Sequence, residues 1–196
     1  MKRGTLLIVS GPAGVGKGTV VAEATEKAAG GIYLSVSATT RQPRSIDKEG
    51  ETYFFKTKEE FEDMIKNDML LEHACYVGNY YGTPKKPVTD ALEAGKDVIL
   101  EIEVQGALQV KKNYPEAVLM FIVPPSISEL EARLRGRGTE TEEQIASRLS
   151  RAKEEFEMIP EYDYIIENNT VSEAVCDLMT VLKAERLKQS KYNKEL

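Results

Sequence analysis

The stretch that decides the fold reads Gly11-Pro12-Ala13-Gly14-Val15-Gly16-Lys17-Gly18-Thr19. It directly follows an apolar segment that ends at Ser10. Glycines at this density let the backbone curl so that successive N–H groups point inward, where they bind phosphate oxygens. A helix expected to begin near Lys17 adds the positive end of its dipole, and the Lys17 ammonium can reach the β- and γ-phosphates of a nucleotide. All nine residues are therefore candidates for binding a nucleoside triphosphate, against the alternative of a plain glycine-rich turn with a surface lysine.

One position departs from the common form of this loop. A serine or threonine usually follows the lysine and binds Mg²⁺, whereas here Gly18 follows it and Thr19 comes one position later. We therefore expect Mg²⁺ to be held by the nucleotide and waters, with Thr19 as the one candidate hydroxyl ligand. The Gly-Lys-Gly-Thr form is more typical of small nucleotide kinases than of GTPases.

The pattern on either side of the loop predicts an α/β domain. Near-continuous apolar runs, typical of parallel strands buried on both faces, cover residues 5–10, 32–36, 97–102, 117–123 and 164–166. Between them, helices are expected to begin at Thr57, Ser126 and Thr141, each followed three residues later by Glu or Gln, and the last helix near Ser172. This alternation predicts a three-layer sandwich of the P-loop NTPase type with a five-stranded, mostly parallel sheet.

Composition excludes several classes of protein. The chain has 196 residues, a net charge of −6 and a pI near 5.1, which argue against a binder of duplex nucleic acid. No apolar run approaches the ~20 residues of a membrane span, and residues 6–9 are too few for a signal peptide, so a cytoplasmic location is expected. Cys75 and Cys176 have no metal-site spacing and are expected to be reduced packing residues.

Two polar segments interrupt the alternation of strands and helices. Residues 38–56 are too long for an ordinary loop, and residues 135–151 are dense in Arg and Glu, with Gly136 and Gly138 as expected hinges. We predict a core of residues 1–34, 88–127 and 156–196, an insertion at 35–87 and a mobile lid at 128–155. Arg135 and Arg151 of the lid are expected on solvated helix faces.

The insertion contains two arginines suited to a phosphate. Arg41 and Arg44 lie three apart around Pro43, and a guanidinium fork binds two phosphate oxygens at once, which lysine cannot do. Local basic clusters on an acidic chain favour a small anionic substrate.

Several further segments then identify a family resemblance. They are residues 35–44, 50–55, 71–73, 78–84, 102–107 and 135–143. With the phosphate loop, and in this order, they closely resemble the guanylate kinase family over residues 6 to about 186. The resemblance implies transfer of the γ-phosphoryl group of ATP to GMP or dGMP with Mg²⁺ as cofactor, and it makes residues 35–87 the GMP-binding insertion.

The resemblance also implies roles for individual residues. The family's binders of the GMP phosphate correspond to Arg41, Arg44, Tyr53 and Tyr81. Its guanine-reading positions correspond to Ser37, Glu72, Thr83 and Glu103, with Glu101 as a further GMP-binding candidate. Its catalytic lid arginines correspond to Arg133, Arg137 and Arg148, and its adenine contact to Asn168. The family often has Asp at positions 101 and 103 and Ser at 83, so whether Glu101 or Glu103 contacts guanine stays open.

The chemistry of guanine supports the assignment of Glu72. The N1–H and 2-amino groups of guanine are adjacent donors, and one carboxylate can accept from both, whereas adenine has no donor at N1. The acceptor phosphate is already ionised, so no general base is expected. Rate acceleration would come from in-line positioning and fixed positive charge on Lys17, Arg41, Mg²⁺ and the lid arginines.

Two other functions compete with this interpretation. One is a P-loop kinase for a different small molecule, such as a ribose phosphate, which the combination of Ser37, Glu72 and Thr83 disfavours. The other is a non-catalytic, guanylate-kinase-like binding module, which the intact Gly16-Lys17 loop and the lid arginines disfavour. The sequence leaves open whether the protein is a monomer or a homo-oligomer.

Overall fold

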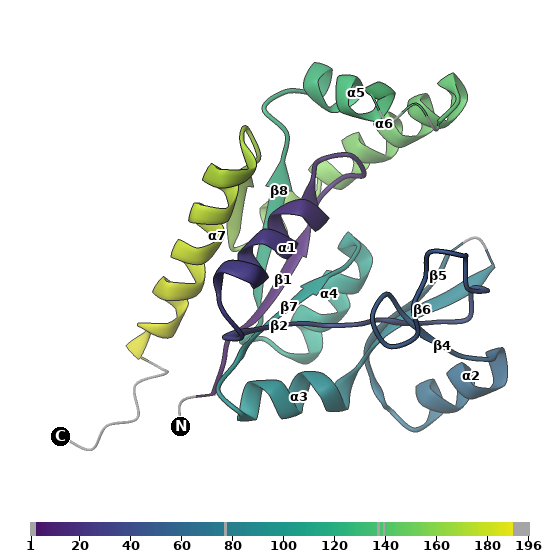
Figure 1. The fold of residues 1–196 in the computed structure, drawn as a ribbon, viewed down its shortest axis with the longest axis vertical. Coiled ribbons are helices and arrows are strands. Elements are labelled where there is room, and N and C mark those ends of the chain that lie inside the picture. The colour runs from purple at the N-terminus through teal and green to yellow at the C-terminus, as the bar shows by residue number, and fades with distance from the viewer. Residues whose placement is uncertain (1–2, 77, 137, 139, 190–196) are drawn as a thin grey trace.

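A computed structural model of the chain describes residues 3–76, 78–136, 138 and 140–189. Its main sheet has five parallel strands in the order β2-β7-β1-β8-β9 (Figure 1). The strands are β1 (Leu6–Ser10), β2 (Ile32–Leu34), β7 (Asp97–Glu101), β8 (Val118–Val123) and β9 (Tyr164–Glu167). Each apolar run of the sequence forms one of these strands, which confirms the predicted sheet.

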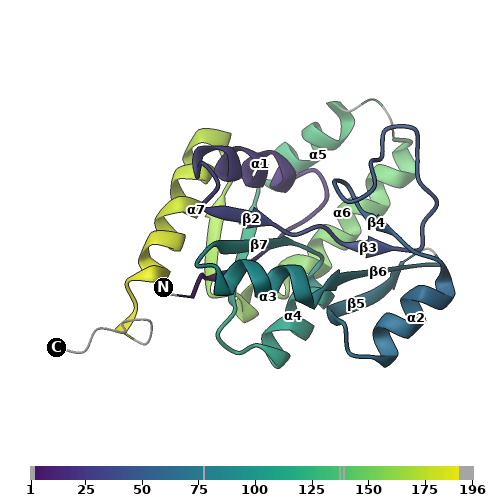
Figure 2. The same cartoon turned by 60° about the horizontal axis from the view of Figure 1, so that its bottom comes forward.

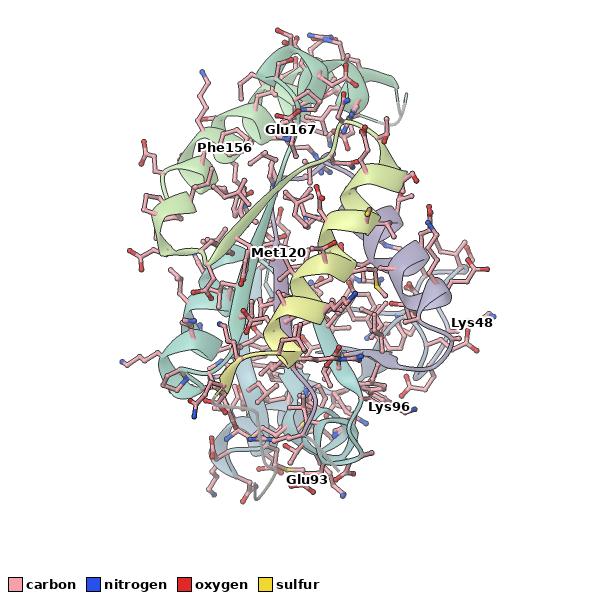
Figure 3. The ribbon with its side chains drawn as sticks, turned by 90° about the vertical axis from the view of Figure 1, so that its left-hand side faces the viewer. Lys48, Glu93, Lys96, Met120, Phe156 and Glu167 are labelled. Atoms are coloured by element: carbon pink, nitrogen blue, oxygen red, sulfur yellow. The ribbon has the colours of Figure 1, made fainter. Side chains whose placement is uncertain are left out.

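Helices cover both faces of this sheet and give the predicted three layers. They are α1 (Lys17–Lys27) and α7 (Val171–Arg186) on one face, and α3 (Lys85–Glu93) and α4 (Val104–Asn113) on the other. Alternation along β1 divides the core, since Leu7 packs with α1 and α7 while Ile8 packs with α3 and α4. Figure 3 labels Met120, a fully buried residue of β8, beside α7.

A second sheet, not predicted from the sequence, lies within the predicted insertion. Its strands, in the order β4-β3-β6-β5, are β3 (Ala38–Thr39), β4 (Phe54–Phe55), β5 (Leu70–Tyr76) and β6 (Asn79–Pro84). Helix α2 (Lys58–Lys66) packs on this sheet through Phe61, which is fully buried and stacks on Tyr80. These strands are short or partly exposed, so they lack the apolar runs that mark the main sheet.

The predicted lid consists of two helices, α5 (Ile127–Gly136) and α6 (Glu142–Phe156), and the short helix η1 (Ile159–Glu161) follows it. Thr57 and Thr141 form complete capping boxes with Glu60 and Gln144, as expected from the sequence. At the start of α5, the Ser126 hydroxyl accepts from the N–H of Glu129 at 3.0 Å. In two views, α7 and α2 lie at opposite ends of the molecule (Figure 1, Figure 2).

The topology brings the candidate residues to one edge of the main sheet. Because its strands are parallel, the phosphate loop after β1, Glu101 at the end of β7, the lid after β8 and Asn168 after β9 all lie at the carboxyl edge. The chain also leaves the main sheet at this edge, after β2, and enters the second sheet. Ligands of open α/β sheets bind at this edge, so the fold positions a site there.

The cysteines differ from expectation. Both Cys75 and Cys176 are free, but both are exposed, so the predicted packing role is wrong. Cys75 lies near the exposed end of β5, and Cys176 lies on the solvent face of α7. Across the described part of the chain, no helix has the length and apolar character needed to cross a membrane.

Candidate active site

The phosphate loop takes the tight form that its glycines predict. Gly14 and Gly16 have φ of 91° and 94°, a left-handed region that favours glycine, and Gly16 caps α1. A Cβ on Gly16 would lie 2.5 Å from the Asn168 side-chain nitrogen. A side chain at position 16 would therefore both strain the backbone and displace Asn168.

Lys17 begins α1 and turns its side chain back over the loop. Its ammonium donates to the carbonyl of Gly11 and, at 3.3 Å, to that of Pro12. The ammonium is therefore held at the mouth of the loop, where the phosphates of a nucleotide would lie. Thr19, in the first turn of α1, is exposed.

Asn168 and Arg133 meet on the far side of the loop. The buried Asn168 amide donates to the Val15 carbonyl at 2.7 Å. Arg133, on α5, donates to the Asn168 carbonyl at 3.0 Å and to Val15 O at 3.4 Å, and Glu129 pairs with its Nε at 2.8 Å. The structure thus brings together a residue expected at adenine and a residue expected in the lid, through their shared contact with the loop.

Two carboxylates lie at the end of β7: Glu101 is its last residue and lies close to Lys17, and Glu103 comes two positions later. Glu101 is exposed, yet desolvation by the protein around it raises its pKa; the charge of Lys17 lowers this pKa and that of Glu103 raises it. A Cβ on Gly18 would lie 3.6 Å from a Glu101 carboxylate oxygen, so the two residues face each other. Glu103 is the N-cap residue of α4, makes no capping hydrogen bond with its side chain, and is exposed.

Glu72 and Thr83 form a buried polar pair on adjacent strands of the second sheet. The Thr83 hydroxyl donates to Glu72 Oε1 at 2.7 Å, and Glu72 is 7% exposed. Burial raises the pKa of Glu72, and the hydrogen bonds from Thr83 oppose this rise. A Cβ on Gly106 would lie 2.8 Å from Glu72 Oε2, so a side chain at this position of α4 would displace the carboxylate.

Arg41, Tyr53 and Tyr81 form a second cluster on this sheet. The Arg41 guanidinium lies 5.3 Å from the centre of the Tyr53 ring, and the Tyr53 and Tyr81 rings are 6.1 Å apart. Burial and the neighbouring Tyr81 raise the pKa of Tyr53. Arg44 is exposed, and Ser37 is half-buried just before β3, with its carbonyl accepting from the N–H of Phe54.

The remaining lid arginines are less closely grouped. Arg148 pairs with Glu140 at 3.0 Å, within the lid, and Arg137 lies outside the described residues. Arg135 pairs with Glu131 and Glu142, on an exposed face as expected.

Arg151 is exposed, as expected for a solvated helix face, and it also joins three parts of the molecule. It pairs with Glu103 of the core at 2.9 Å and with Glu155 of its own helix at 3.2 Å. Its guanidinium also lies 5.2 Å from the Tyr76 ring of the second sheet. The contacts of Arg151 were not predicted from the sequence, and neither was the role of Asp47, which pairs with Arg41 at 2.9 Å. Nothing in the local sequence distinguishes these two residues from other charged surface residues.

Comparison with known proteins agrees with this geometry. The family model for guanylate kinase matches residues 3–185. The chain is 53% identical over 190 residues to guanylate kinase of Halalkalibacterium halodurans, covering 97% of this chain and 93% of that one. It is 52% identical over 199 residues to guanylate kinase of Bacillus cereus, covering 100% and 97%.

A solved structure matches as well. The crystal structure of guanylate kinase from Anaplasma phagocytophilum superposes with a TM-score of 0.78 at 34% identity, covering 97% of this chain and 90% of that chain. Matches over nearly the full length in both sequence and fold, together with the phosphate loop described above, show that the chain belongs to the guanylate kinase family.

Proposed function

We propose that this protein transfers the γ-phosphoryl group of ATP to GMP or dGMP, giving ADP and GDP or dGDP. The observation that carries the proposal is the buried Glu72–Thr83 pair, whose Oε2 faces α4 at Gly106. A carboxylate buried without a cation beside it costs stability, so its position calls for a ligand with two adjacent donors. The Watson–Crick edge of guanine is such a ligand.

The donor nucleotide would bind along residues 11–19. The N–H groups of the loop and the start of α1 would hold its phosphates, and Lys17 would move from the loop carbonyls to the β- and γ-phosphates. Asn168, beside Gly16, would contact adenine.

The acceptor would bind between the second sheet and the end of β7. Arg41, Arg44, Tyr53 and Tyr81 would bind its phosphate. Glu72, Thr83, Ser37 and one of the two carboxylates at 101 and 103 would read the base. In the structure, Glu103 is engaged by Arg151, whereas Glu101 faces the phosphate loop, so we assign the base to Glu103 and the phosphate side to Glu101.

The donor groups at this edge fit Mg²⁺ held mainly by the nucleotide. The described residues contain no cluster of three or more acidic, histidine or cysteine side chains placed to hold a metal ion. Hard oxygen ligands are present, however, in Thr19 and in Glu101, which faces Gly18 where other loops carry a hydroxyl. Bound there, the metal would neutralise charge on the β- and γ-phosphates.

The protein's own part in the transfer is positioning and fixed charge. Lys17, Arg41 and the lid arginines Arg133, Arg137 and Arg148 would surround the transferring group, and no side chain needs to remove a proton from an ionised acceptor. We propose that residues 128–155 close over the nucleotides and exclude water, which otherwise would accept the phosphoryl group. Both substrates are small nucleotides, so a cytoplasmic location fits this role.

A coupled assay of ADP formation tests the proposal. Purified protein with ATP and Mg²⁺ should turn over GMP and dGMP, while AMP and CMP should be slower by roughly 10⁴-fold in kcat/KM, because a polar pocket rejects a ligand that leaves its groups unpaired. Equal rates with GMP and AMP, or no GDP from GMP, would contradict it.

A further inference from the structure

We propose that Asp47 is a positioning residue, which fixes the Arg41 guanidinium in the orientation that receives the acceptor phosphate. This inference rests on the proposed function, since it concerns the phosphate of GMP. Asp47 lies in the segment between β3 and β4, outside the set of residues assigned above to either nucleotide.

The contacts of Asp47 hold both Arg41 and the backbone of Arg44 in place. One carboxylate oxygen, Oδ2, lies 2.9 Å from Arg41 Nη1 and accepts the backbone N–H of Arg44 at 2.7 Å. The Asp47 and Arg41 side chains are only 8% and 16% exposed, whereas Lys48 and Glu51, an ion pair of the same segment, are 69% and 67% exposed. Asp47 therefore joins the two arginines expected at the phosphate from within the protein.

The geometry leaves one edge of Arg41 for a ligand. Nη1 donates to the carbonyl of Gln42 at 2.9 Å and pairs with Asp47. The plane of the guanidinium is held by the rings of Tyr53 and Phe55, at 5.3 Å and 5.8 Å. Among the described residues, neither Nε nor Nη2 has a hydrogen-bond partner. These two nitrogens form the edge that binds two oxygens of a phosphate in parallel.

Two effects of Asp47 on phosphate binding oppose each other. The negative charge of Asp47 repels the incoming anion. Asp47 also keeps the Arg41 side chain in one conformation, so that less conformational entropy is lost when the phosphate binds. Hydrogen bonds from the Arg41 guanidinium and from the Arg44 backbone N–H offset part of the negative charge of Asp47, and both lower its pKa. We therefore expect positioning to outweigh repulsion.

Steady-state kinetics of Asp47→Ala and Asp47→Asn test this inference. Asp47→Ala should raise the KM for GMP by about tenfold, the loss expected for one hydrogen bond to a charged group. Its KM for ATP should change less than about threefold, because Lys17 and the lid are untouched. Asp47→Asn, which keeps the shape and an acceptor oxygen, should give a smaller rise in the same direction.

A double-mutant cycle shows whether Asp47 acts through Arg41. If it does, adding Asp47→Ala to Arg41→Ala should leave the KM for GMP within about twofold of Arg41→Ala alone. The matched control is Glu51→Ala, which removes an exposed carboxylate from the same segment and should match the wild type.

The inference fails if both Asp47 variants bind GMP as well as or better than the wild type, or if Asp47→Ala adds a further tenfold loss to Arg41→Ala. The isosteric Asp47→Asn keeps the test decisive should the alanine variant unfold. Failure of the wild type to phosphorylate GMP would instead overturn the proposed function. An active wild type with unaffected Asp47 variants would overturn this inference alone.

Discussion

Glu72 shows at the scale of one residue how binding and stability oppose each other. Burial raises its pKa, with Thr83 as the opposing hydrogen-bond donor. The pKa of Glu72 in the folded protein lies above its unfolded value of about 4.3. Between these two pKa values the native state therefore binds a proton more tightly than the unfolded state does. Stability therefore falls as pH rises from the unfolded through the folded pKa, and the carboxylate destabilises the ligand-free protein at neutral pH.

Glu72→Gln should separate these two effects. At pH 7.5 we expect the variant to unfold at a higher urea concentration than the wild type, with the difference vanishing near pH 4, where both side chains are neutral. Its kcat/KM for GMP should fall about 100-fold, since the Gln amide offers a donor to the donors of guanine, while the KM for ATP stays similar. Equal losses for both nucleotides, or a variant less stable at pH 7.5 than at pH 4 relative to wild type, would contradict this interpretation. Glu62→Gln, an exposed carboxylate on α2, is the control.

At the scale of an element, helix α6 is tied to the rest of the molecule by few side chains. Ile145 and Ala152 are buried in the core cluster, whereas most other positions of the helix are exposed. Arg151 adds the ion pair with Glu103 and the contact with Tyr76. Because this ion pair is solvated, it contributes little to global stability but restricts how far α6 can move from the second sheet.

Arg151→Ala should therefore loosen α6 locally. We expect faster amide hydrogen exchange in residues 142–156 of the nucleotide-free protein, with a loss of less than about 1 kcal/mol in the free energy of unfolding. Mass spectrometry of peptides that cover α6 and α7 would measure both the effect and its confinement. Lys153→Ala, on the same helix, serves as the control. Unchanged exchange in α6 would show that Arg151 does not restrain the lid.

At the scale of the whole molecule, the C-terminal helix fastens the main sheet at the edge opposite to the site. Arg186, at the end of α7, pairs with Asp97 at the start of β7 at 2.7 Å. The Asp97 side chain is 1% exposed, and its other oxygen accepts the N–H of Thr5 at 2.8 Å. The pair thus joins the last helix to the start of β7 and, through Asp97, to the residue that precedes β1.

Arg186→Ala should lower stability without affecting catalysis. It leaves a buried carboxylate with one backbone partner, and we expect a loss of about 1–3 kcal/mol in the free energy of urea unfolding. Turnover of GMP at 25 °C should stay within about twofold of wild type, because the carboxyl edge of the sheet is unchanged. Lys183→Ala, one turn earlier on α7, is the matched control. A variant with the wild-type unfolding midpoint would contradict the structural role.

The sequence by itself determined the main sheet, the phosphate loop and the helix starts. These features depend on local rules: apolar runs for buried parallel strands, glycine where φ is positive, and Thr with Glu or Gln three residues on for a capping box. The loop at residues 11–19 and the caps at Thr57 and Thr141 therefore could be read without any knowledge of distant residues.

Only the tertiary structure decided the second sheet and the pairing of charged residues. The contacts of Arg41 with Asp47, Glu72 with Thr83, and Arg151 with Glu103 are set by how strands and helices meet in space. The exposure of Cys75 and Cys176 follows from the same placement. In the sequence, an arginine that forms a solvent-exposed ion pair cannot be told from an arginine that binds a ligand. What separates them is burial and the direction of the side chain, and both arise from long-range packing.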